Sequence, residues 1–299
     1  MLLNSQTLCF EWLRSKKGKI KPSTYDKYDM ILNKYLLDFF NSYHLDQLDI
    51  SIIKDYFISL LNQGLSSSVV QSIKNVLKAI YITYENQYGF NHIDFSLVKI
   101  EEEKKETEYL TNKQFKQLHQ YCLNKNNDIC LSILLAMDTG MMIGEIVALK
   151  VSDIDLENQL IHINKRAQRT KNDDIGSKTI YEVYDVEWPM LRDITIPKEL
   201  FFYLQEYLKD KESDCYLTSH LYVVSEVTKL QRGLDRIGSK YGFKTTFKDL
   251  RNMYKERCLK SCMDMNILME LLGVQSLKLN LPENYNSSNE EKKKQVNKL

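Results

Sequence analysis

The stretch TGMMIGEIVALKVSDID, residues 139–155, decides how the second half of the chain is expected to fold. The apolar positions of MMIGEIVALK repeat with helical spacing, and VSDID favours a turn that leads into a strand. Met141 and Met142 stand where the polar pair Thr139 and Gly140 opens the chain toward a ligand. Because methionine is apolar and flexible, we expect both side chains to pack in the interior.

The segments around this stretch combine helix and strand patterns. Helices are expected over TNKQFKQLHQYCLNKN, capped by Thr111, over NNDICLSILLAMDTG, and from residue 226 onward. DLENQLIHINKRAQRTKNDD alternates like a strand that ends in a basic hairpin, and LRDITIPKELFFYLQEYLKD predicts a short strand followed by a helix. The second half should therefore hold a small sheet inside a helical domain.

The first half is helical throughout. Helix starts are expected at Pro22 and at Asp49 or Ser51, with further serine caps at residues 66–68 and helix ends at Gly64 and Gly89. KIEEEKKETE, residues 99–108, is densely charged and predicts a solvated linker, with one long exposed helix as the alternative. The predicted organisation is a helical bundle over 1–98, a linker over 99–108, a mixed domain over 109–285 and a tail over 286–299.

Composition narrows the class of protein. The 299 residues carry 41 Lys plus Arg against 40 Asp plus Glu, so the placement of charge must decide whether nucleic acid binds. No apolar run approaches the roughly 18 residues of a membrane span, which makes a cytoplasmic protein the expectation. The six cysteines lack zinc spacing, and Cys258 with Cys262 has no second pair, so reduced thiols and no metal are expected.

The order of these segments resembles the tyrosine recombinases, also called phage integrases, across nearly the whole chain. KPSTYDKYDMILNKYLLDFF and GLSSSVVQSIKNVLKAI are similar to their core-binding domain, and LTNKQFKQL to the opening of their catalytic domain. DTGMMIGEIVALKVSDID is similar to their first arginine box, TFKDLRNMYKERC to the second, and LMELLGVQS to the segment before the nucleophile. The resemblance implies a mainly α fold with a small β-sheet: an amino-terminal SAM-like helical domain and an α+β catalytic domain.

The resemblance also implies a mechanism without metal or other cofactor. A tyrosine attacks a DNA phosphate, two arginines and a histidine or lysine stabilise the transition state, and a hairpin lysine protonates the leaving oxygen. On this pattern Tyr285 is the nucleophile, Arg251 the second arginine, and Lys248 stands at the histidine position. A surface ion pair with Asp249 or Glu256 is the alternative for Arg251.

Other positions of the pattern lack the expected side chain. Met142 occupies the place of the first arginine, and Val274 the place of a histidine or tryptophan that binds phosphate. The hairpin lysine falls near Glu187, Trp188 or Pro189, and Lys178 would substitute only in an enlarged hairpin. A thioether donates no hydrogen bond, so half of the arginine clamp is missing.

Basic residues gather in three runs that are candidates for DNA-phosphate contacts. A solvated surface is the alternative for the first of them. The candidates are Lys16, Lys17, Lys19, Lys21 and Lys27; then Lys165, Arg166, Arg169 and Lys171; then Lys244, with Arg232, Arg236, Lys240 and Lys248 nearby.

These observations predict a DNA-binding member of the family that acts in site-specific recombination or integration, with impaired or lost strand cleavage. The alternatives are an active recombinase that works through Tyr285 with a non-standard phosphate site, and a helical interaction protein with no DNA role. The expected partners are double-stranded DNA and a catalytically complete recombinase. We expect a monomer in isolation, an oligomer on DNA, no membrane association, and a cytoplasmic protein that joins the nucleoid when bound.

Overall fold

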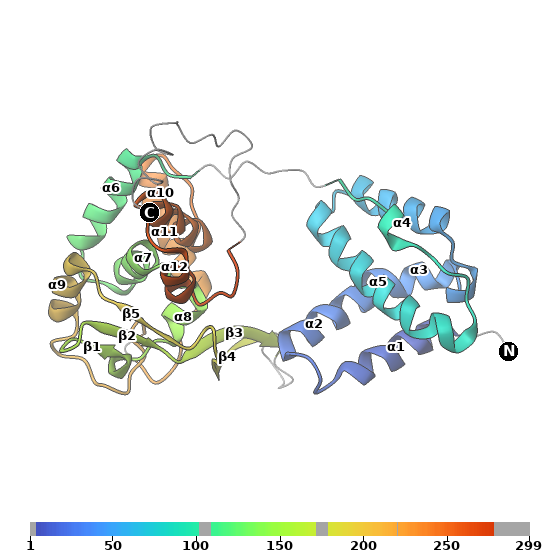
Figure 1. Cartoon of the computed structure of the whole chain (residues 1–299), viewed down its shortest axis with the longest axis horizontal. Coiled ribbons are helices and arrows are strands. Elements are labelled where there is room, and N and C mark those ends of the chain that lie inside the picture. The colour runs from blue at the N-terminus through green and yellow to red at the C-terminus, as the bar shows by residue number, and fades with distance from the viewer. Residues whose placement is uncertain (1–3, 102–108, 172–178, 220, 278–299) are drawn as a thin grey trace. The chain divides into compact units, whose positions relative to one another are not determined.

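The computed structural model describes residues 4–101, 109–171, 179–219 and 221–277 (Figure 1). The chain divides into two compact units, residues 1–108 with 167–183, and residues 109–166 with 184–299. Most of the predicted linker, residues 102–108, and the whole predicted tail lie outside the described residues.

The first unit is built from helices whose starts and ends follow local chemistry. Pro22 opens one helix at its first position, and the Asp49 carboxylate accepts the Ile52 N–H at 2.8 Å, so Asp49 rather than Ser51 is the cap. Gly89 ends the longest of these helices in the left-handed conformation at φ 69°. The helices are α1 (Ser5–Lys16), α2 (Pro22–Ile31), α3 (Leu37–Ser42), α4 (Ile50–Asn62) and α5 (Ser67–Tyr88), with a π-helical turn at Leu32–Leu36 and short 3-10 turns at Leu45–Gln47 and Phe95–Leu97.

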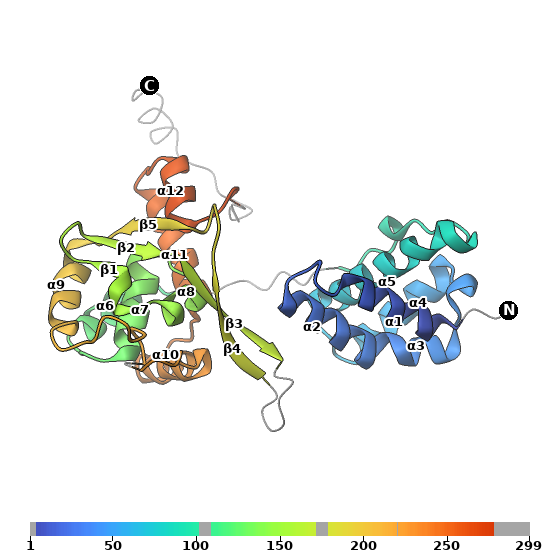
Figure 2. The ribbon, with the colours of Figure 1, turned by 90° about the horizontal axis from the view of Figure 1, so that it is seen from below.

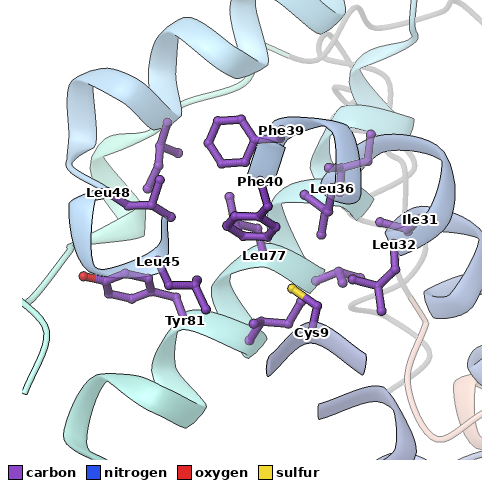
Figure 3. Packing of buried hydrophobic residues seen from close by; sticks show 14 of the residues in the cluster. Cys9, Ile31, Leu32, Leu36, Phe39, Phe40, Leu45, Leu48, Leu77 and Tyr81 are labelled. Carbon is purple, nitrogen blue, oxygen red and sulfur yellow. The ribbon is translucent and has the colours of Figure 1, made fainter. Parts of the chain in front are cut away.

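One apolar core joins these helices (Figure 3). Cys9 of α1, Leu32 and Leu36 of the π-helical turn, and Leu77 of α5 have no exposed surface. Phe39 and Phe40 of α3 close the other side of this core. The helical bundle predicted for the first half of the chain is therefore present.

The second unit packs helices around a central one. α7 is buried along nearly its whole length and contacts α6, α8, α9, α10 and α11 (Figure 1). Thr111 caps α6 as predicted, because its hydroxyl accepts the Gln114 N–H. The helices are α6 (Asn112–Leu123), α7 (Asp128–Thr139), α8 (Ile143–Ala148), α9 (Lys198–Tyr207), α10 (Val227–Tyr241), α11 (Phe247–Lys260) and α12 (Met265–Leu272), with a 3-10 turn at Val151–Asp153.

Two small antiparallel sheets lie between α8 and α9 in the chain. β1 (Ile154–Asp155), β2 (Leu160–Ile163) and β5 (Arg192–Thr195) form one sheet in the order β1-β2-β5, in which Ile161 pairs with Ile194. β3 (Lys165–Lys171) and β4 (Thr179–Asp185) form the predicted hairpin. The mainly α fold with a small β component is thus confirmed. No helix in the described ranges combines the length and apolar content that crossing a bilayer requires.

A histidine–carboxylate pair joins α6 to α7 inside the second unit. His119 Nε2 lies 2.9 and 3.0 Å from the two carboxylate oxygens of Asp138. The hydrogen bond to Asp138 raises the pKa of His119 above its ordinary value, while burial and the nearby Arg257 act in the opposite direction. Glu199 Oε2 on α9 lies 3.8 Å from His119 Nδ1 and also raises the pKa of His119. Protonation of His119 therefore favours the folded state.

We expect the stability difference between the unmodified protein and His119→Gln to depend on pH. Since the folded-state pKa is raised, the stabilisation is complete below the unfolded value of about 6.5 and is lost as pH rises through the folded value. Urea unfolding of both proteins between about pH 5.5 and about pH 9 measures it. His92→Gln is the control, because that side chain is 81% exposed and solvent screens its partner. A difference that stays constant with pH would contradict the expectation.

Candidate active site

Gly140 marks the turn between α7 and α8, where a side chain would be both strained and crowded. Its φ of 68° lies in the left-handed region, and an added Cβ would approach the Tyr254 ring to 2.4 Å. The carbonyl of Gly140 accepts a hydrogen bond from Arg251 Nη1 at 2.6 Å. The turn therefore brings the first box against the second, which lies on α11.

The two methionines of the first box occupy different environments. Met141 has no exposed surface, whereas Met142 is half-buried at the residue that caps α8. The Met142 N–H donates to Glu145 Oε2 at 2.8 Å, so the start of α8 is closed by a carboxylate from its own first turn. Met142 itself brings a thioether, and no cation, to this position.

Arg251 is held by backbone carbonyls rather than by carboxylates. Besides Gly140, it donates from Nη2 to the Leu272 carbonyl at 2.7 Å, which is the last residue of α12. Asp249, one alternative partner, accepts instead from the Thr246 N–H and hydroxyl and so begins α11. Burial lowers the pKa of Arg251, Glu145 raises it, and Arg192 and Arg166 lower it. These four charged groups therefore share one region of the second unit.

A buried ion pair beside Arg251 was not predicted from the sequence. Glu145 and Arg192 have side-chain exposures of 0% and 2%, and their contacts run from Nη1 to Oε1 at 2.8 Å and from Nη2 to Oε2 at 3.0 Å. Arg192 also donates from Nε to the Leu271 carbonyl at 2.8 Å and from Nη1 to the Met190 carbonyl at 2.8 Å. The signals that could have indicated the pair are the position of Glu145 on the first turn of α8 and that of Arg192 on the buried face of β5.

The remaining predicted site residues have no described contact with Arg251. Lys248 is exposed on α11, one turn before Arg251, and is able to lie on the same side of that helix. Val274 is half-buried against the apolar cluster of Cys258, Leu268 and Leu272. Glu187 is exposed after β4, next to Trp188, which is 75% exposed. Tyr285, Lys178 and the side chain of Lys171 lie outside what the structure describes.

Comparison with known proteins identifies the family. Residues 108–292 match the model of the Phage integrase family, and residues 6–61 match that of the phage integrase N-terminal SAM-like domain. The chain belongs to the phage integrase family, the tyrosine recombinases. The family that the order of the sequence segments suggested is thus confirmed.

Individual relatives agree with this assignment. The chain is 26% identical over 299 residues to a tyrosine recombinase XerC-like protein of Caldanaerobacter subterraneus subsp. tengcongensis, covering 89% of this chain and 74% of that protein. It is 27% identical over 197 residues to the integrase of Staphylococcus phage L54a, covering 59% of this chain and 56% of the relative.

Solved structures share the same fold at low sequence identity. The Tn1549 transposon integrase in complex with transposon right end DNA superposes with a TM-score of 0.81 at 17% identity over 99% of both chains. A lambda integrase dimer bound to a COC′ core site gives a TM-score of 0.64 at 15% identity, covering 91% of this chain and 74% of that one.

We expect Arg192→Met to lower the free energy of unfolding by about 3–5 kcal/mol, because it leaves the Glu145 carboxylate buried without its partner. The double variant Glu145→Met with Arg192→Met should lose less than the sum of the two single variants, since no charge is then left unpaired. Urea unfolding measures all three.

The matched control for this pair is Lys209→Met. Lys209 pairs with Glu206, and both side chains are 63% exposed, so its removal should change stability by at most about 1 kcal/mol. Similar small losses for Lys209→Met and Arg192→Met would show that the buried pair does not stabilise the fold.

Proposed function

We propose that this tyrosine recombinase family member binds duplex DNA at recombination sites and has impaired or lost strand cleavage. The observation that carries the proposal is the contrast between two arginine positions. Arg251 is held in the pocket by the Gly140 and Leu272 carbonyls, whereas Met142 stands at the first-box position. The pocket thus keeps a cation for a backbone phosphate but lacks the second member of the clamp.

The exposed cations support a DNA partner. In the first unit, Lys17, Lys19 and Lys21 lie exposed where α1 ends and α2 begins, and Lys27 is exposed on α2. In the second unit, Arg232, Arg236 and Lys240 are exposed on α10, with Lys244 just after it and Lys248 on α11. Lysines and arginines in such positions contact phosphates without reading bases. The integrase structures similar to this chain were determined with DNA.

The chemistry of strand cleavage needs more than one cation at the phosphate. Losing one preorganised donor to the transition state costs roughly 3 kcal/mol, or about 100- to 1,000-fold in rate. Val274 donates no hydrogen bond from its side chain, and Lys248 offers an ammonium group, which has donors and no acceptor, in place of an imidazole. Glu187 carries a negative charge where the pattern expects the hairpin lysine. These substitutions act on the chemical step and leave the fold intact.

Two further functions remain as competitors. In the first, Tyr285 cleaves DNA, with other residues in place of the standard phosphate-binding set. The presence of Arg192 and Arg166 near Arg251 favours this function, because the region then holds three guanidinium groups. A catalytically complete recombinase that joins this protein on DNA and supplies cleavage belongs to the same class. In the second, the chain is a helical interaction protein with no DNA role.

Incubation with a nicked half-site DNA tests the proposed function. Because the cleaved end of such a substrate diffuses away, even slow attack accumulates a covalent adduct that resists denaturant. We expect no adduct, or one that forms about 100-fold or more slowly than with an intact recombinase, consistent with the missing donor. An adduct that forms rapidly and disappears in Tyr285→Phe would replace the proposal with the active recombinase.

Mobility shift at low salt separates DNA binding from the interaction protein. The affinity for duplex DNA should fall steeply with salt, with a logarithmic slope of about 0.9 for each phosphate contact. The paired substitution Lys19→Gln with Lys21→Gln should reduce this slope, whereas Lys209→Gln, outside all three basic runs, should leave it unchanged. A protein that binds no duplex at low salt would exclude a DNA role.

A further inference from the structure

The start of the β3–β4 hairpin is fixed by one buried carboxylate. Asp153, which is 6% exposed, accepts from Asn164 Nδ2 at 3.2 Å and from Lys165 Nζ at 3.1 Å. It also accepts from the Lys150 N–H at 2.8 Å, which ties it to the 3-10 turn. Asn164, which links β2 to β3, and Lys165, the first residue of β3, are both anchored by Asp153. The residue that follows Lys165 therefore has a defined position.

That residue, Arg166, keeps unused hydrogen-bonding capacity. Lys165 turns toward Asp153, and successive side chains on a strand point to opposite faces, so Arg166 lies on the face of β3 opposite to Lys165. Its Nε is buried, yet within the described part of the chain it makes no hydrogen bond. A buried, unbonded donor is costly to keep, which indicates a group that a ligand completes.

Arg166 also belongs to the active-site region. α8, whose first turn carries Glu145, lies beside the base of the β3–β4 hairpin in both views (Figures 1 and 2). The charge of Arg166 acts on Arg251 together with those of Glu145 and Arg192. Arg192 already makes four hydrogen bonds, to both oxygens of Glu145 and to the Leu271 and Met190 carbonyls, so its guanidinium has little capacity left for a ligand. Of the two arginines whose charges act on Arg251, Arg166 is therefore the one with a buried N–H that makes no hydrogen bond.

We propose that Arg166 binds the same backbone phosphate as Arg251 and takes the role that an arginine at position 142 would have. The inference rests on the proposed function, because it names the groups that hold the DNA phosphate. An arginine delivered from a strand offers the same planar fork as one delivered from a helix, and its bidentate geometry suits a phosphate. The residue supplies binding only, and it does not replace the proton-donating lysine that the resemblance expects near position 187.

Titration with inorganic phosphate tests whether the two arginines share a site. The side-chain N–H signals of the full chain, isotopically labelled at arginine, are assigned with the variants Arg166→Lys, Arg251→Lys and Arg169→Lys. We expect the signals of Arg166 and Arg251 to move together with one apparent dissociation constant. Arg169 should not follow them, because it lies three residues further along β3 and so on the other face of the strand. If Arg251 moves alone, or if neither moves, the inference is wrong.

Duplex binding tests whether Arg166 replaces the first-box arginine. Arg166→Gln should weaken duplex affinity by roughly tenfold or more, as expected for loss of hydrogen bonds to a charged group. In a Met142→Arg background the same change should cost less than about threefold, because the new guanidinium competes for the same phosphate. Arg169→Gln, the matched control, should cost the same in both backgrounds. Equal losses for Arg166→Gln in the two backgrounds would overturn the inference.

The two experiments also separate this inference from the proposed function. If the unmodified protein binds no duplex, the proposed function fails, while the phosphate titration still decides whether Arg166 and Arg251 share a ligand. Thermal unfolding of Met142→Arg is measured first, and Met142→Lys takes its place if the arginine unfolds the half-buried site.

Discussion

A buried ion pair between Glu145 and Arg192 joins segments that are 47 residues apart in the chain. Such a pair is stable only when its remaining donors and acceptors are satisfied, because the cost of removing both charges from water is large. Here the second oxygen of Glu145 also accepts from the start of α8, and Arg192 also donates to the Leu271 carbonyl at the end of α12. The pair therefore fixes how α8, β5 and α12 meet, and the candidate site is built where they meet.

The end of α12 depends on two guanidinium groups. The last carbonyls of a helix have no partner within it and attract cations. Leu271 takes a hydrogen bond from Arg192, and Leu272 takes one from Arg251, which also binds the Gly140 carbonyl. Because these contacts involve backbone oxygens, they persist whatever side chain stands at position 142. The contacts between Gly140, Arg251 and the end of α12 therefore do not depend on the methionine at position 142.

The features that local chemistry determines could be predicted from the sequence. The helix start near Asp49 or Ser51 follows from local residues, of which Asp49 proved to be the cap, and the fold class and family followed from the order of such segments. The arrangement of charges in the site could not be predicted in this way, because it depends on which side chains, distant in the sequence, become neighbours in the fold. No role for Arg192 was predicted from the sequence, and the pairing of β5 with β2 accompanies its position in the interior. The position of Arg166 depends on its neighbour Lys165, which Asp153 anchors. These two side chains are 12 residues apart in the chain, so the sequence does not show that they meet.

Binding a phosphate and breaking it make different demands on the same pocket. Binding needs positive charge with free donors, and such charge can come from any element that reaches the pocket, including a strand. Cleavage needs, in addition, groups that move protons at fixed points, and these depend on particular side chains at particular positions. With Arg251 and Arg166 as the proposed phosphate ligands, and with glutamate at position 187 where the resemblance expects the proton-donating lysine, the proposed function meets the first demand and not the second. Neither Glu187 nor Val274 supplies a hydrogen-bond partner to the Glu145–Arg192 pair, so the loss of proton transfer in the proposed function is compatible with an intact fold.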